Sequence, residues 1–507
     1  MADSPVLIIG AGPTGLVLAL FLARRGIKLR IIDQNDGPGQ ASRAMAVHAR
    51  TLEFYDQLGF ADLVVARGIK GEGVRLREQS KDVADFAFGD IGQGLSPFPF
   101  VLSFPQDDHE RLLGEKLREA GLEIEWSTAL ESFTQDASGV EVVLNRNGSV
   151  ERCRAAYLCG CDGAHSAVRH GLGLGFPGGS YDQLFYVADV EAEDEDGGPD
   201  FTVSLDAKSL DLKLPIRSSG MQRLIGLVPE SLSAREGLSF EDIRDTPERL
   251  LGVRVRRVNW FSTYHVHHRV ASNFRVGPCF LAGDAGHIHS PAGGQGMNTG
   301  IGDAVNLAWK LADVLRGRAD PALLDTYEPE RIAFARQLVA TTDRLFQAMV
   351  GQTLGSEVLR TWLMPHLFPF LMGFSSVRRS LFRRVSQTRI ACHDSPLSQG
   401  RAGEVQGGDR LPWVEEADNF APLRSGEWQV HVYGQADSAF RTAAEECGFP
   451  VHSFGWTKTA QHAGLQQHAA YLVRPDGYVG LAASRQDAGE LHAYASRIGL
   501  RAVAPSP

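Results

Sequence analysis

Cysteines are few in this chain, and their spacing excludes several classes of protein. Six cysteines are spread over 507 residues; Cys159 and Cys161 have one residue between them, and no CxxC pair is present. Small secreted domains depend on dense cysteine pairs, and structural zinc sites need two close pairs of ligands. We therefore expect neither a disulfide scaffold nor a zinc module, and we expect a reducing, cytoplasmic location.

Positive charge is also scarce. The chain has 51 Lys and Arg against 61 Asp and Glu, which gives a formal net charge of −10. Proteins that bind nucleic acids present a basic surface to the phosphate backbone. We therefore expect no nucleic-acid partner.

No apolar run is long and uninterrupted enough to cross a membrane. The most apolar stretch, residues 6–23, contains three glycines and a proline, and Arg24-Arg25 closes it. A spanning helix needs about 20 consecutive apolar residues, and a secretory signal begins with a basic segment that is missing here. With 43% hydrophobic and 22% charged residues, the composition is that of a globular protein without a membrane partner, long enough for two or three domains.

That apolar stretch is instead typical of a nucleotide-binding βαβ unit. The pattern predicts a buried strand over 6–9, a helix over 16–25 and a second strand over 28–32. The turn between the first strand and the helix reads Gly10-Ala11-Gly12-Pro13-Thr14-Gly15, a GxGxxG motif. Its glycines allow a tight turn and the close approach of a pyrophosphate, whose charge the helix N-terminus stabilises. Asp33, after the second strand, favours a ribose with a free 2′-hydroxyl, and hence FAD or NAD rather than NADP.

Two later segments also place polar residues after a predicted strand. The strand over 155–161 runs into Asp162-Gly163, and Ser166 is placed to cap a short helix that carries Arg169. An apolar run from residue 280 ends in Gly283-Asp284, and the glycine-rich loop 291–298 and an amphipathic helix follow. Small residues let a backbone approach a flat ligand, and the free N–H groups of a helix start favour an electron-rich edge. Taken alone, each segment also fits an ordinary capped helix or strand–loop–helix turn.

In this order, the segments 10–15, 162–169 and 283–284 resemble the class A flavoprotein monooxygenases. These are single-component aromatic hydroxylases related to para-hydroxybenzoate hydroxylase and phenol hydroxylase. The resemblance implies an α/β fold (α+β overall) with a Rossmann-like FAD-binding domain, a β-sheet substrate domain and a thioredoxin-like C-terminal domain. It implies non-covalent FAD, with NAD(P)H as co-substrate and O2 as oxidant. The implied reaction hydroxylates an aromatic, phenolic or polyketide-type substrate through a flavin C4a-hydroperoxide.

The resemblance also implies a set of site residues. Arg43 is expected to pair with the pyrophosphate, Gln106 to bond to the FAD, and Asn298 to bond to the pyrimidine edge of the flavin. The loop that begins at Pro291 is expected to pass along the isoalloxazine, which makes Pro291 a candidate catalytic residue as well. The full cofactor-binding set is Gly10, Gly12, Pro13, Thr14, Gly15, Asp33, Gln34, Arg43, Gln106, Asp162, Gly163, Arg169, Gly283, Asp284, Pro291, Gly294, Gly296, Met297 and Asn298.

His48 is the candidate acid–base residue. A phenol, with a pKa of about 10, becomes a better nucleophile when it loses its proton, and histidine can take that proton near neutral pH. The alternative for His48 is a packing role. His287 and His289 form an HxH pair, but no further ligand lies nearby in the sequence, so we expect no metal site.

We expect the FAD-binding domain to comprise 1–173 and 269–345, with part of 73–104 joining a substrate domain over 174–268. Strands are predicted there over 185–190, 201–205, 212–216 and 222–229, with an acidic loop over 191–199. Residues 346–400 are expected to form a helical linker region, and 333–389 carry an apolar face that includes Phe346, Leu359, Trp362, Phe368, Phe370 and Phe374.

Residues 401–507 are expected to form the thioredoxin-like domain. Without a CxxC pair, its role would be structural or in dimerisation. Within it, 406–412 is interpreted as a linker, and Pro475-Asp476-Gly477 as the turn of a hairpin over 471–480.

Two other functions stay open at this point. One is a flavin-dependent dehydrogenase, reductase or other oxidation on the same scaffold, and the other is a non-catalytic flavin-binding protein. The expected partners are a small aromatic substrate and O2, in a monomer or a homodimer. The identity of the aromatic ring, and the choice between NADH and NADPH, are open as well.

Overall fold

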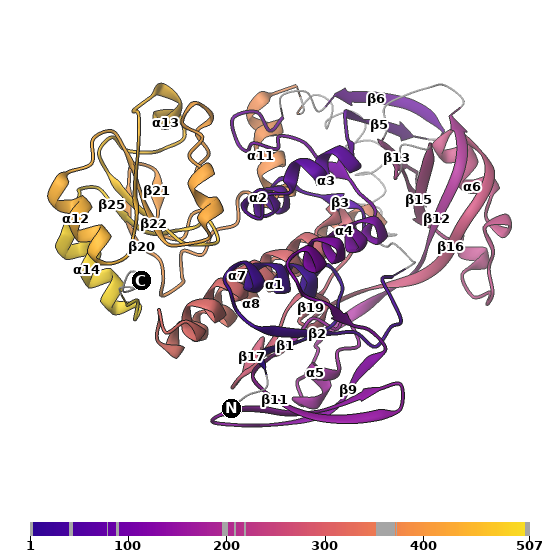
Figure 1. The fold of residues 1–507 in the computed structure, drawn as a ribbon. Coiled ribbons are helices and arrows are strands. Elements are labelled where there is room, and N and C mark those ends of the chain that lie inside the picture. Colours follow the sequence, from indigo (N-terminus) through magenta and orange to yellow (C-terminus); the bar gives the residue numbers. More distant parts are fainter. Residues whose placement is uncertain are drawn as a thin grey trace.

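Three large β-sheets, each with its own helices, organise the chain (Figure 1). The computed structural model describes residues 4–39, 44–78, 80–87, 91–194, 201–206, 209–216, 220–350, 371 and 373–501. Helices and strands alternate through the first part, so the expected mixed α/β class is confirmed. Among the helices in these residues, none combines the length and apolar character that crossing a bilayer requires.

The first sheet is largely parallel, with the strand order β17-β18-β11-β1-β2-β8 and with β10 and β9 extending from β11. Helices α1 and α7 pack against each other on one side of it, and α4 lies beside α1 (Figure 1). The strands are β1 (Ser4–Ile9), β2 (Leu29–Ile32), β8 (Ile124–Glu125), β9 (Thr128–Asp136), β10 (Gly139–Arg146), β11 (Ser149–Gly160), β17 (Arg275–Val276) and β18 (Cys279–Leu281). The helices are α1 (Pro13–Arg24), α4 (Gln106–Glu119), α5 (Ala167–Gly171) and α7 (Gly296–Leu315).

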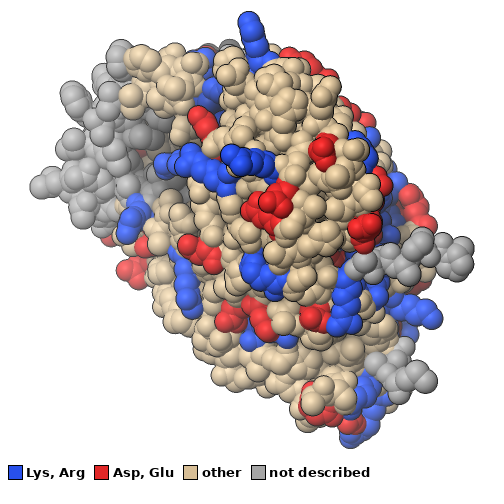
Figure 2. Space-filling model, turned by 90° about the vertical axis from the view of Figure 1, so that its left-hand side faces the viewer, with Lys and Arg blue, Asp and Glu red and all other residues tan. Residues whose placement is uncertain are grey.

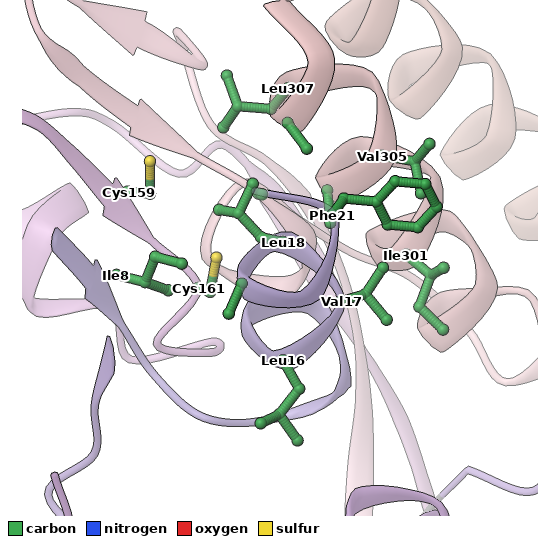
Figure 3. Close-up of a cluster of buried hydrophobic side chains, with 14 of the residues drawn as sticks. Ile8, Leu16, Val17, Leu18, Phe21, Cys159, Cys161, Ile301, Val305 and Leu307 are labelled. Atoms are coloured by element: carbon green, nitrogen blue, oxygen red, sulfur yellow. The ribbon is translucent and has the colours of Figure 1, made fainter. Parts of the chain in front are cut away.

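Helix α1 is apolar on every side, and it is enclosed between the sheet and α7. Figure 3 shows its side chains in one cluster with strand residues and with α7 residues. A helix that is hydrophobic all round is a buried helix, and each large aliphatic side chain buried in this way contributes about 1.5–3 kcal/mol. The stretch that could be mistaken for a membrane span is therefore the centre of the core. The labelled members of the cluster are Ile8, Leu16, Val17, Leu18, Phe21, Cys159, Cys161, Ile301, Val305 and Leu307.

The second sheet has the order β19-β16-β12-β15-β14-β13-β5-β6, and it is antiparallel except for the β13–β5 pair. One face is covered by α6 (Asp245–Leu251), and the other packs against α8 (Tyr327–Val350) through Phe346. Two strands from the first half of the chain, β5 and β6, form one edge. The strands are β5 (Gly73–Glu78), β6 (Lys81–Ala87), β12 (Gly178–Asp194), β13 (Phe201–Leu205), β14 (Leu210–Pro215), β15 (Met221–Leu227), β16 (Val253–Val270) and β19 (His287–Ile288).

The acidic segment after Val190 is a strand as far as Asp194, so the predicted loop over 191–199 is wrong for its first four residues. Glu191 lies 3.7 Å from Arg257, and Glu193 pairs with Arg256, both on the neighbouring strand β16. Opposite charges across a strand pair stabilise it, which the local sequence does not reveal. Residues 195–199 lie outside the described residues.

A small sheet of β3 (Ala46–Val47), β7 (Leu102–Ser103) and β4 (Ile69–Lys70) lies between the first and the second large sheet (Figure 1). Strand β3 leads directly into α2 (Ala49–Gln57), and α3 (Ala61–Arg67) follows. Ser103 donates a hydrogen bond to the Pro215 carbonyl at the end of β14. This sheet therefore connects α2 to the second large sheet.

The C-terminal part is a six-stranded sheet with the order β21-β20-β25-β24-β22-β23. Strand β22 runs parallel to β23 and antiparallel to β24, and α12 and α14 cover one face, which is a thioredoxin-like arrangement (Figure 1). The hairpin predicted around Pro475 is confirmed, since β24 and β25 are antiparallel neighbours. The elements are β20 (Gln399–Ala402), β21 (Val405–Gln406), β22 (Gln429–Tyr433), β23 (Val451–Phe454), β24 (Ala470–Val473), β25 (Val479–Ala483), α12 (Ser438–Glu446), α13 (Lys458–His462) and α14 (Ala488–Arg497).

Residues 406–412 do not form a linker. Gln406 belongs to β21, which pairs with β20, and Arg410 is bridged to Tyr478 beside the C-terminal hairpin. Gly408 has a φ of +97°, and a Cβ there would lie 2.6 Å from the Cys392 backbone. The glycines of this segment therefore serve close packing. Helix α11 (Ser375–Val385) precedes it, while Leu359, Trp362, Phe368 and Phe370 lie outside the described residues.

Candidate active site

The three motifs meet at one edge of the first sheet. In the parallel register, Ile9 pairs with both Ile32 and Gly160, and Gly160 pairs with Leu281. The turns that follow these strands, which carry Gly10, Asp33, Asp162 and Gly283, therefore leave the sheet side by side. In open α/β sheets, ligands bind outside the carboxyl ends of the strands.

The GxGxxG turn leaves space where a phosphate would approach. Gly10 has a φ of +101°, and a Cβ there would lie 2.4 Å from the Cys161 carbonyl oxygen. A Cβ on Gly15 would lie 2.0 Å from the Gly10 oxygen, whereas one on Gly12 would meet nothing within 4 Å. Helix α1 has Pro13 in its first turn, no side-chain cap and no acidic residue there. Its N-terminus therefore has the features that fit a pyrophosphate.

Asp33 is held at this turn by the backbone. Its Oδ2 accepts from the Ala11 amide at 2.8 Å and its Oδ1 from the Asn35 amide at 2.9 Å. Each carboxylate oxygen keeps a second lone pair for a ribose hydroxyl. A cavity of about 240 Å³ lies beside the turn, lined by residues that include Ala11, Glu110 and Trp126. Gln34 is exposed next to it.

The second motif supplies an unpaired buried oxygen. Asp162 Oδ2 accepts from the Val168 amide at 3.2 Å, while Oδ1 is buried and has no partner among the described residues. Burial raises the pKa of Asp162. Ser166 caps α5 by accepting from the Arg169 amide at 3.0 Å, as the sequence predicts. An unpaired buried carboxylate oxygen is costly unless a ligand donates to it, so Asp162 fits a hydroxyl-bearing ligand.

Arg169 and Thr14 tie the motifs together. Arg169 Nη1 donates to the Ala285 carbonyl at 3.0 Å, which links the Asp162 turn to the Gly283-Asp284 turn. Thr14 Oγ1 lies 2.6 Å from where a Cβ on Gly283 would be. Gly283 has a φ of +62°, and glycine is required there both by that conformation and by the close contact. Asp284, beside it, is exposed.

A buried polar group that sequence reasoning missed supports this turn. Asp303 on α7 accepts from the Gly283 amide at 3.0 Å, from His287 Nε2 at 2.8 Å and from Arg331 Nε at 2.5 Å. Burial opposes ionisation, but Arg331 and His287 hold the pKa of Asp303 below its usual value. A carboxylate among the small and apolar residues of the first half of α7 is the signal that could have found it. His287 is thus a partner of Asp303, and His289 Nδ1 lies 2.7 Å from the Ser290 carbonyl.

The glycine-rich loop is fastened to β3 through Asn298. The Asn298 Oδ1 accepts from the His48 amide at 2.9 Å and from Thr51 Oγ1 at 2.7 Å. Its Nδ2 donates to the Ala46 carbonyl at 2.8 Å and to the Gly294 carbonyl at 2.9 Å. All of these bonds go to protein groups, so the side chain positions the loop in this structure. A direct bond from Asn298 to a flavin stays a prediction.

His48 lies between β3 and α2, against the same loop. Its Nε2 is 3.0 Å from the Gly293 carbonyl oxygen, and Nδ1 is buried with no partner among the described residues. Burial lowers the pKa of His48 to about 4. The imidazole is therefore neutral at physiological pH and has a lone pair for a proton, but burial makes it a weaker base than an exposed histidine.

The remaining predicted residues lie around this core. Gln106 begins α4, where its Nε2 donates to Glu110 at 2.8 Å and its Oε1 accepts from the Ala44 amide at 3.3 Å. Pro291 is exposed at the start of the loop, and Met297 is half-buried at the start of α7. Gly163 and Gly294 have positive φ angles, and Gly296 begins α7. Arg43 lies outside the described residues.

Known proteins resemble this chain in sequence as well as in architecture. A family model described as an FAD binding domain matches residues 3–342. The chain is 38% identical to 6-methylpretetramide 4-monooxygenase of Streptomyces rimosus, over 96% of this chain and 92% of that protein. It is 33% identical to pentachlorophenol 4-monooxygenase of Sphingobium chlorophenolicum, over 70% of this chain and 66% of that protein.

Two solved structures match almost the whole chain. The anhydrotetracycline hydroxylase OxyS from Streptomyces rimosus superposes with a TM-score of 0.78 at 28% identity, covering 98% of this chain and 99% of that chain. The flavin-dependent monooxygenase PieE, solved with FAD and substrate, has a TM-score of 0.81 at 24% identity, with coverages of 98% and 99%, and shows the shared fold.

The chain therefore belongs to the family of FAD-binding aromatic monooxygenases. Within that class it is an FAD-dependent enzyme that uses NAD(P)H and O2 to oxidise a small aromatic substrate. A monooxygenase is thereby supported over a dehydrogenase or reductase on the same scaffold.

Proposed function

We propose that this enzyme hydroxylates a phenolic ring of a fused, polyketide-type substrate, which binds between the glycine-rich loop and the second sheet. The observation that carries the proposal is the wide apolar face of that sheet. Strands β5, β13, β14, β15, β12 and β16 contribute to one cluster, which packs against Phe346 of α8. Because β19 follows the Gly283-Asp284 turn and pairs with β16, this face begins next to the loop. We propose that a flat ligand of several rings packs against the part of this face that α8 does not cover.

The named relatives support this substrate class. One acts on 6-methylpretetramide, and others are named for anhydrotetracycline and tetracenomycin A2. The sheet also holds a buried polar pair, Arg223 and Asp189, with Nε–Oδ1 and Nη2–Oδ2 distances of 2.7 and 2.8 Å. Their register places both side chains on the same face as Phe185, so a substrate there would meet one charged pair in an apolar setting.

In this proposal, each residue at the edge of the first sheet binds a different part of FAD. Gly12 and the start of α1 would hold the pyrophosphate, Asp33 the ribose, and Asp162 and Asp284 the ribitol. The loop from Pro291 through Gly296 would line the isoalloxazine. When bound, FAD accepts the electrons of NAD(P)H and passes one oxygen atom of O2 to the ring. The protein orients the two and keeps water out.

His48 acts in this proposal as the base that takes the phenol proton. Its Nε2 has a carbonyl partner and therefore carries the hydrogen, which leaves the lone pair on the buried Nδ1. A deprotonated phenol carries more electron density at the ring carbon that receives oxygen. Packing alone remains the alternative for His48, and its substitution separates the two roles.

We also propose a cytoplasmic location for this enzyme. All six cysteines are free, which a reducing compartment such as the cytoplasm maintains. Acidic and basic side chains are interspersed over the face shown in Figure 2, so this face offers no broad basic surface to a nucleic acid or an acidic membrane. We propose a monomer or homodimer, with a structural role for the C-terminal domain.

The experiment that tests the function is oxygen transfer. The purified protein is loaded with FAD and supplied with NAD(P)H, O2 and a panel of simple phenols and fused polyketide aromatics. We expect at least one fused aromatic to stimulate NAD(P)H oxidation and to gain one oxygen atom by mass spectrometry, with little hydrogen peroxide. NAD(P)H oxidation that yields only peroxide with every compound would overturn the proposal.

A further inference from the structure

A cluster of arginines without carboxylate partners lies on α11 and just after it. Arg379, Arg383, Arg384 and Arg389 are all exposed. Across the described ranges, no Asp or Glu forms an ion pair with any of the four. The chain as a whole carries a net charge of −10, and most arginines elsewhere have acidic partners. A group of unpaired cations on an acidic protein repels itself unless an anion binds to it.

The guanidinium groups of Arg379, Arg383 and Arg389 are close enough to influence one another. Partial burial lowers the pKa of Arg383, and the positive charges of Arg379, Arg410 and Arg389 lower it further. Of these neighbours, Arg410 is paired with Glu53, with a 2.9 Å bond from Nε. Arg379, Arg383 and Arg389 have no carboxylate partner within the described part of the chain. Clustered arginines with free N–H groups match phosphate oxygens, with which they form paired hydrogen bonds.

Helix α11 is attached directly to the glycine-rich loop of the active site. Gln295 Nε2, in that loop, donates to the Val385 carbonyl at 2.8 Å, and Gln387 Nε2 donates to Gln295 Oε1 at 2.7 Å and to Thr299 Oγ1 at 2.9 Å. The Arg50 amide, two residues after His48, donates to the Ser386 carbonyl at 3.2 Å. The arginines of the last turn of α11 therefore sit within a few residues of the loop that lines the flavin.

Gln387 shows how firmly this attachment is made. It has a φ of +60°, in the left-handed region that residues other than glycine rarely adopt. Such a conformation persists only where surrounding contacts impose it, and here the side-chain bonds to the loop do so. On the other side, Phe382 is buried against Gly92, where a Cβ would lie 2.5 Å from its ring. The basic surface of α11 thus has a fixed position relative to the active site.

The GxGxxG turn at the start of α1 serves FAD, so the phosphates of the second dinucleotide need other partners. We infer that the α11 cluster, namely Arg379, Arg383, Arg384 and Arg389, binds the phosphates of NAD(P)H while its nicotinamide reaches the flavin. This inference rests on the family's use of NAD(P)H and goes beyond the proposed substrate. The shared chemistry is the pyrophosphate of NADH and NADPH, with the 2′-phosphate of NADPH as a second possible anchor.

The test is a charge reversal on α11 in the FAD-loaded enzyme. We expect the double variant Arg379→Glu/Arg383→Glu to raise the KM for NADPH at least tenfold, with unchanged FAD content and an unchanged KM for the aromatic substrate. The variant Arg383→Lys, which keeps the charge but cannot form paired hydrogen bonds, should raise the KM for NADPH less than the double variant does. The matched control is Arg146→Glu, an exposed arginine on the distant strand β10, which should leave both constants unchanged.

Two further measurements show which phosphate of the nucleotide the arginines bind and whether the binding is electrostatic. A similar increase of KM for NADH and NADPH assigns the cluster to the pyrophosphate, and an increase for NADPH alone assigns it to the 2′-phosphate; both support the inference. In the wild type, rising ionic strength should weaken NADPH binding more steeply than in the double variant, because salt screens exposed charges. An unchanged KM for both nucleotides, or an increase confined to the aromatic substrate, would overturn it.

Anaerobic reduction keeps this test independent of the proposed substrate. NADPH is mixed with the FAD-loaded enzyme without O2, and the bleaching of the flavin is followed at increasing NADPH concentration. We expect half-maximal reduction at a higher concentration in the double variant, with the same limiting rate. If the wild type reduces FAD but oxygenates no aromatic compound, the proposed function fails while the inference about α11 stands.

Discussion

Arg474 and Glu330 form a two-bonded ion pair in which neither side chain is exposed to solvent. The Nη1–Oε1 and Nη2–Oε2 distances are 2.8 and 3.0 Å, and both side chains have 0% exposure. Arg474 lies at the C-terminal hairpin and Glu330 on α8, so the pair joins the C-terminal domain to α8. Lys310 Nζ also donates to Glu330, at 2.8 Å.

The hairpin turn between β24 and β25 extends this contact. Asp476 binds Arg474 through Nε at 3.0 Å and accepts from Trp309 Nε1 at 2.9 Å and from Asn306 Nδ2 at 3.2 Å, both on α7. Its carbonyl accepts from Arg50 on α2. The turn therefore contacts both helices that border the candidate active site, which supports the proposed structural role of the C-terminal domain.

We predict that removing one partner of the pair destabilises the protein strongly. Arg474→Met leaves Glu330 buried with less compensation, and loss of one partner of a buried pair typically costs about 3–5 kcal/mol. Chemical denaturation should show this loss. The control is Arg501→Met, whose pair with Asp320 is 64% and 47% exposed and should contribute less than about 1 kcal/mol. Equal effects of the two substitutions would contradict the argument.

The same pair predicts a pH dependence of stability. Burial raises the pKa of Glu330, but Arg474 and Lys310 outweigh it and hold that pKa well below its usual range. A carboxyl with a depressed pKa contributes stability that is present above its unfolded pKa, about 4.3, and is lost as the pH falls below it. The wild type should therefore lose more stability than Glu330→Gln between neutral pH and pH 3. Parallel stability curves for the two proteins would refute this.

His48 should control turnover of phenolic substrates. Because burial lowers its pKa to about 4, the neutral base is present throughout pH 5–8, and kcat/KM should fall as the pH drops through about 4. Substituting His48→Gln should lower kcat by about 10²–10⁴, the usual contribution of a general base. The loss should shrink as the pH approaches about 10, where a phenol ionises by itself.

The comparison that isolates this role uses two kinds of substrate. If His48 acts as the base, His48→Gln should affect a phenol far more than the same ring presented as its preformed phenolate at high pH. Unchanged turnover at pH 7 with unchanged FAD content would assign His48 to packing.

Asp33 should account for part of the FAD affinity. A hydrogen bond to a charged acceptor contributes about 1.5–3 kcal/mol, so Asp33→Asn should weaken FAD binding by about 10- to 100-fold. Titration of the apoprotein with FAD, followed by flavin fluorescence, measures this. Asp36→Asn, at an exposed residue three positions further on, is the control and should bind FAD as the wild type does. Wild-type affinity in Asp33→Asn would remove the ribose contact from the proposal.

The parts of this site that depend on turns and helix caps can be predicted from the sequence. Gly10, Gly15 and Gly283 sit in turns whose conformation or close packing only glycine tolerates, so their spacing is visible without a structure. The cap at Ser166 and the hairpin at Pro475 were predictable for the same reason. The fold class followed from these motifs and from the resemblance that they carry.

Partners that are distant in the sequence were not predictable. Arg474 and Glu330 are 144 residues apart, and a charged residue in a strand or helix usually indicates a solvated face. The strand β16 was missed because its sequence, VRVRRVNWFSTYHVHHRV, carries arginines and histidines at many positions. Its acidic partners on β12 were assigned to a loop for the same reason. In each case the tertiary partner, rather than the local pattern, decides the structure.

Asp303 should be required for efficient coupling of NAD(P)H oxidation to hydroxylation. An asparagine there keeps one acceptor but turns an amino group toward the Gly283 amide, His287 or Arg331, so at least one buried donor loses its partner. We expect Asp303→Asn to weaken FAD binding at least tenfold and to increase the hydrogen peroxide released per NAD(P)H oxidised, because the Gly283-Asp284 turn shifts.

Asp313→Asn is the matched control, since Asp313 is a buried carboxylate at the other end of α7, paired with Arg25 at 2.5 Å. Both substitutions should lower stability, but only Asp303→Asn should change FAD affinity and peroxide release. The same change of both quantities in the two variants would assign Asp303 a purely structural role.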